Sequence, residues 1–152
     1  MVDASHRSLI RDMKLALLSE IGARAIYDHM RRRVQDEDLR SLMVELNEAG
    51  LESVRRLREL MIDLGARPRR TSFRRRALAR GLALASRVIG VRFVLRVCMN
   101  AEETVGRWYQ EYALYLLRLE DPERAKTCQD LAQVKQRHAQ ALGAWVGNLT
   151  RR

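Results

Sequence analysis

The chain is poor in proline, cysteine and aromatic residues, and each scarcity narrows what it can be. Only two of its 152 residues are proline and nearly half are apolar, which excludes a disordered chain and predicts one compact helical domain over residues 1–152. Cys98 and Cys128 form no CxxC pair, so neither a disulfide framework nor a zinc knuckle is indicated. Reduced thiols and a polar N-terminus without a signal-peptide core predict a cytoplasmic protein.

Acidic residues are also too few to balance the basic ones. The formal net charge of +10 comes almost wholly from arginine, because lysine occurs only at positions 14, 126 and 135. Such an excess favours an acidic partner, either an anionic membrane surface or nucleic acid. Nucleic acid is the weaker expectation, since aromatic residues make up only 5% of the chain and no helix-turn-helix or zinc-finger pattern is present.

What the sequence does contain is helical periodicity. Apolar residues recur every three or four positions, and no strand-like alternation of useful length occurs. We expect long helices over about 8–34, 37–64, 91–119 and 122–149, with a further helical segment at about 73–89. Gly65 and the Asp121-Pro122-Glu123 run mark helix ends of the usual kind. The sequence therefore predicts an all-α helical bundle.

Three polar residues stand on the core-facing stripes of three different helices: Glu20, Glu102 and His138. Burying a carboxylate is costly unless it is paired, hydrogen-bonded or bound to metal. Inward carboxylates and imidazoles from separate helices are how a ferritin-like four-helix bundle builds a di-iron or di-manganese centre. A structural Glu-His pair or a hydrogen-bonded core histidine is the alternative. On the second helix, the central inward positions hold Gly50 and Ser53, which are poor metal ligands.

Several short motifs resemble the ferritin-like demethoxyubiquinone hydroxylases of ubiquinone biosynthesis. The segment EIGARAIY at 20–27 is similar to the E-x-G-A-x-x-I-Y segment around the first ligand glutamate of that family. The further matches, in the same order along the chain, are ELM at 59–61, LGARP at 64–68, EE at 102–103 followed by Tyr109, and DPE at 121–123. The resemblance covers most of the chain and implies a ferritin-like four-helix bundle.

The resemblance also implies metal-ligand positions, and many of them are altered. Glu20 and Glu102 match ligand glutamates, but the first E-x-x-H falls on Gly50 and Ser53. The second falls on the segment 138–141, or one turn earlier, with Lys135 at its glutamate and His138 at its histidine. About half of the expected ligands are therefore missing, and an intact di-iron centre is not expected. The remaining set suits either no metal or one weakly held iron, manganese or zinc ion.

An additional basic amphipathic segment follows the second helix. Arg76 and Arg80 lie on one face of the predicted helix and Leu78, Leu82 and Ile89 on the other, with Arg75 beside them. Arginines are too many for a membrane-spanning helix. The pattern is typical of a helix lying in an anionic membrane interface, although a solvated basic face of an ordinary bundle helix has the same pattern. The hydroxylases, which the chain resembles, bind membranes peripherally and take a quinone lipid between their helices.

Three hypotheses about function follow. The first is a protein peripheral to the cytoplasmic side of the inner membrane, with an incomplete di-iron site, that binds a quinone or other lipid or a partner protein, including a second copy of itself. The second is an active metal-dependent hydroxylase, a monooxygenase with an atypical site on Glu20, Glu102 and His138. The third is a basic helical protein that binds nucleic acid. Whether the protein is an enzyme stays open at this level.

Overall fold

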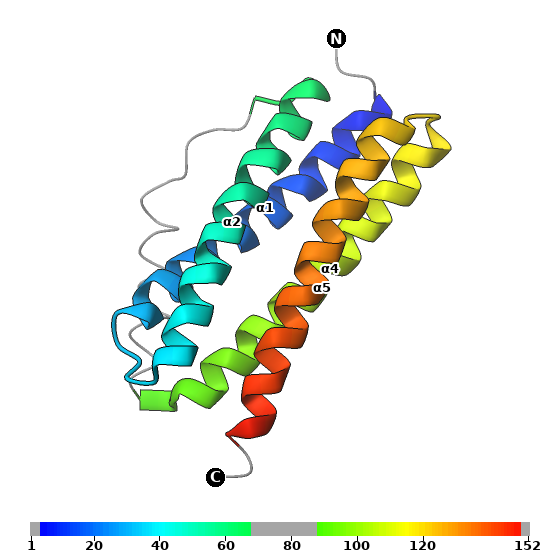
Figure 1. The fold of residues 1–152 in the computed structure, drawn as a ribbon. Helices are drawn as coiled ribbons and strands as arrows, with labels where there is room; N and C mark the ends of the chain where they lie inside the picture. Colours follow the sequence, from blue (N-terminus) through cyan, green and yellow to red (C-terminus); the bar gives the residue numbers. More distant parts are fainter. Residues whose placement is uncertain (1–3, 68–87, 150–152) are drawn as a thin grey trace.

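The computed structural model describes residues 4–67 and 88–149, which form four long helices (Figure 1). These are α1 (Ala4–Arg31), α2 (Glu37–Asp63), α4 (Val91–Arg118) and α5 (Pro122–Asn148). No strand occurs among these residues, and the predicted all-α four-helix bundle is confirmed. The first helix begins about one turn earlier than predicted and ends before Val34. Most of the predicted basic segment falls on residues 68–87, outside the described residues.

Local sequence signals account for the helix ends. The Asp36 side chain accepts a hydrogen bond from the Leu39 backbone N–H at 3.0 Å, which caps the start of α2. Asp121 does the same for α5 through the Arg124 N–H at 3.1 Å. Gly65 follows α2 with a φ of 88°, a left-handed conformation that glycine adopts without strain. The caps therefore fix where each helix enters and leaves the bundle.

The bundle consists of two helical hairpins. α1 packs along α2, and α4 packs along α5; the hairpins then meet through contacts of α1 with α4 and of α2 with α5 (Figure 1). Residues at the same height of the bundle thus come from distant parts of the sequence. This arrangement brings the midpoints of all four helices to one level.

The buried core is divided into two apolar clusters, one toward each end of the bundle. One cluster contains residues from the first half of α1, the second half of α2, the second half of α4 and the first half of α5. The other uses the opposite halves of the same helices. Between the clusters lie the buried polar side chains, at positions 20, 53, 102, 135 and 138. The apolar core is therefore interrupted at mid-height by a polar layer.

The register of α5 differs from the prediction. The spacing of three and four residues that runs through His138 predicts that Val134 and Trp145 lie on the inner stripe of this helix, but both are only partly buried. Lys135 and Leu142 are buried instead, with exposed fractions of 2% and 0%. The helix is thus rotated slightly, so that a lysine joins His138 in the interior.

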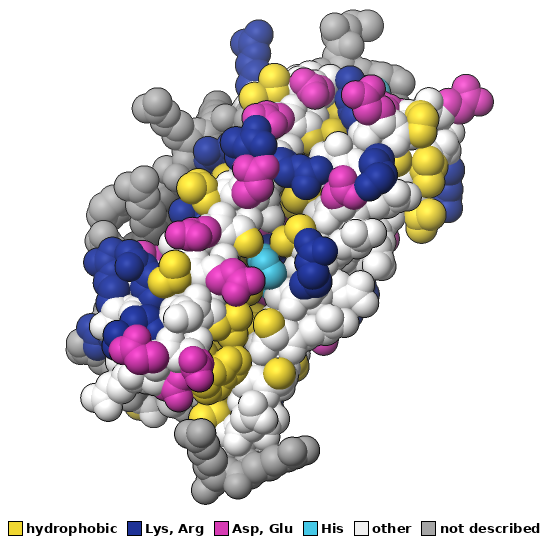
Figure 2. All heavy atoms as spheres, viewed as in Figure 1, with side chains coloured by type: hydrophobic (Ala, Val, Ile, Leu, Met, Phe, Trp, Pro, Cys, Tyr) yellow, Lys and Arg dark blue, Asp and Glu magenta, His cyan; other side chains and the backbone are white. Residues whose placement is uncertain are grey.

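The surface carries charges of both signs. On the face shown in Figure 2, acidic and basic side chains are interspersed rather than segregated, with hydrophobic side chains between them. Exposed apolar side chains gather where α4 begins: Val88, Ile89 and Phe93 are 90%, 52% and 51% exposed. None of the helices within the described residues has the length and apolar character needed to cross a membrane.

Candidate functional site

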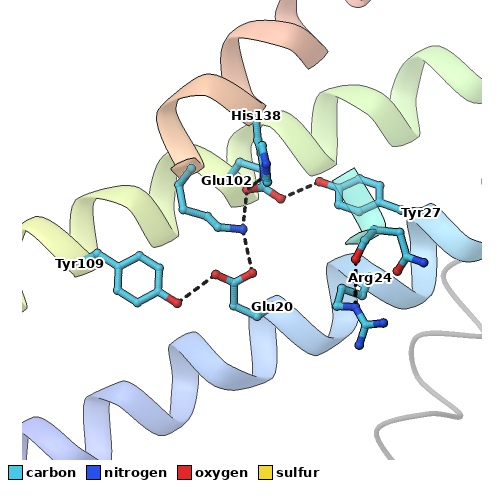
Figure 3. A network of polar contacts seen from close by, with 8 residues as sticks. Glu20, Arg24, Tyr27, Glu102, Tyr109 and His138 are labelled. Carbon is cyan, nitrogen blue, oxygen red and sulfur yellow. Dashed lines mark hydrogen bonds and ion pairs between the residues drawn. The ribbon is translucent and has the colours of Figure 1, made fainter. Parts of the chain in front are cut away.

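The polar layer brings together the three inward residues that the sequence singled out. Glu20 comes from α1, Glu102 from α4 and His138 from α5 (Figure 3). All three are buried, and His138 Nδ1 lies 3.2 Å from Glu102 Oε2. Their meeting at one locus is what the helical periodicity of three separate segments predicted. Their role as metal ligands stays a prediction.

A buried lysine lies at the centre of this layer. Lys135 Nζ is 2.7 Å from Glu20 Oε2 and 2.9 Å from Glu102 Oε2. Both carboxylates contact the same nitrogen, so they are far closer than the roughly 10 Å at which coupling between sites is normally negligible. One ammonium therefore joins α1, α4 and α5 through two buried ion pairs.

Two tyrosines satisfy the remaining carboxylate oxygens. The Tyr27 hydroxyl donates to Glu102 Oε1 at 2.7 Å, and the Tyr109 hydroxyl donates to Glu20 Oε1 at 2.9 Å (Figure 3). Every oxygen of the two carboxylates thus has a partner. A buried charge network is tolerated only when its members are paired in this way. The helical spacing of Tyr27 from Glu20 and of Tyr109 from Glu102, seven residues in each case, predicts inner positions for both, but it did not assign them to the site.

Burial and neighbouring charges shift the pKa values of these groups in different directions. Burial would raise the pKa of Glu102, but contacts with His138, Lys135 and Tyr27 outweigh it and hold that pKa at about 2. Burial, with repulsion from Glu102, raises the pKa of Glu20 above its usual value, and Lys135 offsets only part of this rise. Burial would lower the pKa of Lys135, yet the two carboxylates together raise it. Lys135 therefore carries its positive charge at neutral pH.

The wall that α2 contributes has no such charged groups. Gly50 and Ser53 are both buried at the level of the polar layer, as the sequence pattern predicted. The Arg24 side chain lies against Gly50, because a Cβ atom added to Gly50 would be 2.7 Å from Arg24 Cγ. Arg24 Nε donates to the Asn47 carbonyl oxygen at 3.2 Å, and its guanidinium points away from the network (Figure 3). The stem of an arginine thus fills the space beside Gly50.

The resemblance places a pair of iron ions in this layer, and the residues present do not fit one. The Lys135 ammonium lies between the two carboxylates and, being protonated, has no lone pair for a metal. The pocket that Glu20, Glu102 and Lys135 line measures only ≈ 10 Å³, about the space of one water molecule. Within the part of the chain that the structure describes, no group of three or more His, Cys, Asp or Glu side chains is arranged to hold a metal ion.

Most of the predicted membrane-facing residues fall outside the part of the chain that the structure describes. Arg75, Arg76, Leu78, Arg80 and Leu82 are outside the described residues. Ile89 is described, and its side chain is exposed just before α4. The membrane-binding role of this segment therefore stays a prediction.

Lys135 is the residue of the polar layer that sequence reasoning only half found. The hydroxylase resemblance put it at a ligand-glutamate position in one of two possible registers, while the periodicity left it off the inner stripe. Its spacing of three from His138 and four from Leu131 was the available signal, since those spacings share one face of a helix. The structure selects the register in which Lys135 and His138 face inward together.

Comparison with known proteins agrees with the motifs and with the fold. The family model described as Ubiquinone biosynthesis protein COQ7 matches residues 10–142, which is most of the chain and includes every residue of the polar layer. No curated protein and no solved structure matches the chain. The four-helix bundle is consistent with the ferritin-like fold of that family. The chain therefore belongs to the COQ7 family of ubiquinone biosynthesis proteins.

Proposed function

We propose that this COQ7-family protein binds a quinone or related lipid at a membrane surface and does not hydroxylate it. The observation that carries the proposal is the position of Lys135 Nζ, between Glu20 and Glu102 at 2.7 and 2.9 Å. These are the carboxylates that the family resemblance assigns to the metal pair. A protonated lysine there offsets part of their negative charge and repels a second cation at the same place.

The exposed apolar side chains at the start of α4 support the membrane part of the proposal. Val88, Ile89 and Phe93 are each at least half exposed and directly follow the arginine-rich sequence of residues 69–87. Apolar side chains next to clustered arginine are typical of a segment that lies in the headgroup region of an anionic bilayer. We infer that the start of α4 and the preceding segment face the cytoplasmic leaflet.

Vesicle flotation tests the membrane part. The chain is expected to float with phosphatidylglycerol vesicles and not with phosphatidylcholine vesicles at moderate salt. Reversing Arg75, Arg76 and Arg80 to glutamate should weaken binding at least tenfold, since each basic residue near an anionic surface contributes about 1 kcal/mol. The matched control reverses Arg7, Arg11 and Arg118, which lie at the end of the bundle away from the start of α4. Equal loss in both triple variants would contradict the proposed surface.

Metal content and turnover test the catalytic part. Protein purified aerobically and then supplied with ferrous iron should hold no stoichiometric iron pair and should leave a demethoxyquinone unchanged in the presence of a reductant and oxygen. When the phosphatidylglycerol vesicles contain long-chain ubiquinone, the protein should float with them, and the quinone should be recovered unchanged with the protein. Two tightly bound irons per chain, or hydroxylated quinone above a no-protein control, would establish the alternative, an active hydroxylase with an atypical site.

A further inference from the structure

The contacts around Lys135 Nζ are those of a cation bound by carboxylates from separate helices. The nitrogen contacts one oxygen of Glu20 and one oxygen of Glu102, and the second of these oxygens also lies 3.2 Å from His138 Nδ1. Two carboxylates that meet at one nitrogen, with an imidazole in contact with one of them, contain the donor types that suit a divalent first-row metal ion. Here the cation at that point belongs to the chain itself.

We propose that Lys135 is an internal substitute for a metal ion, and that replacing it alone opens a site for one divalent cation in this bundle. The substitution Lys135→Glu removes the competing ammonium and adds a carboxylate from α5. Glu20, Glu102 and His138 then supply the other donors from the helices on which they already face the polar layer. The ligand class is a single Mn²⁺, Fe²⁺, Co²⁺ or Zn²⁺ ion held by oxygen and imidazole nitrogen.

The α2 wall explains why one ion is expected and not two. Gly50 and Ser53 offer no carboxylate or imidazole, and the Arg24 stem fills the space beside Gly50. A side chain at position 50 would collide with Arg24 Cγ, since even a Cβ atom there would be 2.7 Å away. The α2 wall and the α5 wall therefore lack metal ligands for different reasons. A single substitution can supply a ligand on the α5 wall but not on the α2 wall.

This inference rests on the proposed lack of a metal pair in the wild-type protein, but it does not depend on lipid binding. Lipid binding is tested by vesicle flotation and metal binding by titration, so either can fail while the other holds. A wild-type chain that binds iron would contradict both the proposed function and this inference. A variant that gains no metal would contradict this inference alone.

The experiment is a titration of the full chain with Co²⁺, followed by visible absorption and by calorimetry. Wild-type protein should give no saturable binding. Lys135→Glu should bind one Co²⁺ per chain saturably, with ligand-field bands and a rise in Tm on metal addition, because metal binding is coupled to folding. Lys126→Glu, which reverses an exposed lysine on the same helix, is the matched control and should bind no more tightly than wild type.

Two further variants decide the remaining outcomes. Lys135→His supplies an uncharged imidazole donor in place of a third buried carboxylate. This variant is titrated with Co²⁺ if Lys135→Glu does not fold without metal. Adding Glu102→Gln to either variant should lower the affinity at least tenfold. The inference is overturned if a folded position-135 variant binds no Co²⁺, if Glu102→Gln has no effect, or if neither variant folds with or without metal. Refolding that occurs only when Co²⁺ is present supports it.

Discussion

The α5 wall and the α2 wall of the polar layer are built in two different ways. On the α5 wall, Lys135 supplies positive charge to two carboxylates, and every charged atom keeps a partner. On the α2 wall, Gly50 and Ser53 supply no charge, and an arginine stem from α1 fills the space. The α5 wall is held by buried ion pairs, and the α2 wall is filled by packing. Substitutions on the two walls should therefore change the free energy of unfolding by different amounts, and only those in the charged network should respond to pH.

The largest effect is expected on the α5 wall, from Lys135→Met. The change keeps most of the length of the side chain but leaves two buried carboxylates without their cation, which typically costs about 3–5 kcal/mol. Urea unfolding followed by circular dichroism measures the loss. Lys126→Met on the same helix is the control, because its exposed pair with Asp130 should contribute no more than about 1 kcal/mol.

Non-additivity sharpens this result. Combining Lys135→Met with Glu20→Gln should recover part of the lost free energy of unfolding, since the double variant buries one carboxylate fewer. Simple addition of the two losses would show that Lys135 stabilises the fold by packing alone.

The next effect separates the two carboxylates by their response to acid. The pKa of Glu102 is held at about 2, below its usual 4.5, so its ionised form is stabilised by folding. That stability, about 3 kcal/mol by linkage, is fully present above pH 4.5 and is lost as the pH falls toward 2. Glu102→Gln should therefore flatten the fall in unfolding free energy between pH 4.5 and 2.

Glu20→Gln should change the pH profile above pH 4.5 instead, and in the opposite direction. The pKa of Glu20 is raised by burial, so the folded protein takes up a proton there before the unfolded chain does. Its contribution to stability is present below pH 4.5 and is lost as the pH rises through its folded pKa. Unfolding free energies of both variants, measured at several pH values, check this. The two carboxylates would prove equivalent if both substitutions flattened the acid limb.

The smallest effect is expected on the α2 wall. Gly50→Ala should destabilise the fold by about 1 kcal/mol, because the added methyl group displaces Arg24 and this outweighs the gain from removing a helical glycine. Gly22→Ala on α1 is the matched control. Nothing lies within 4 Å of a Cβ atom there, so it should stabilise the helix by roughly 0.5–1 kcal/mol. Truncating Arg24 to alanine in the Gly50→Ala background should remove the difference between the two glycines.

Periodicity was enough to place Glu20, Glu102 and His138 on inner stripes, because the apolar residues around each of them define a face of a long helix. It also placed Gly50 and Ser53 in the interior. It did not place Lys135 there, because a buried lysine is stable only when it is paired with acidic groups. Those partners lie on α1 and α4, and the pattern of α5 alone does not reveal them. The position of Arg24 could not be predicted either. Its side chain packs against Gly50 of the neighbouring helix α2, where glycine leaves space for it.

The sequence separation of the polar contacts has a consequence for the rates of folding and unfolding. Glu20 and Lys135 are 115 residues apart, whereas each hairpin is stabilised by contacts between neighbouring helices. Local hairpins form early and long-range pairings late, so the ion pairs between α1 and α5 should be largely absent from the folding transition state. Their loss would then speed unfolding while leaving the folding rate nearly unchanged. The buried lysine thereby sets the lifetime of the folded state more than the speed with which it is reached.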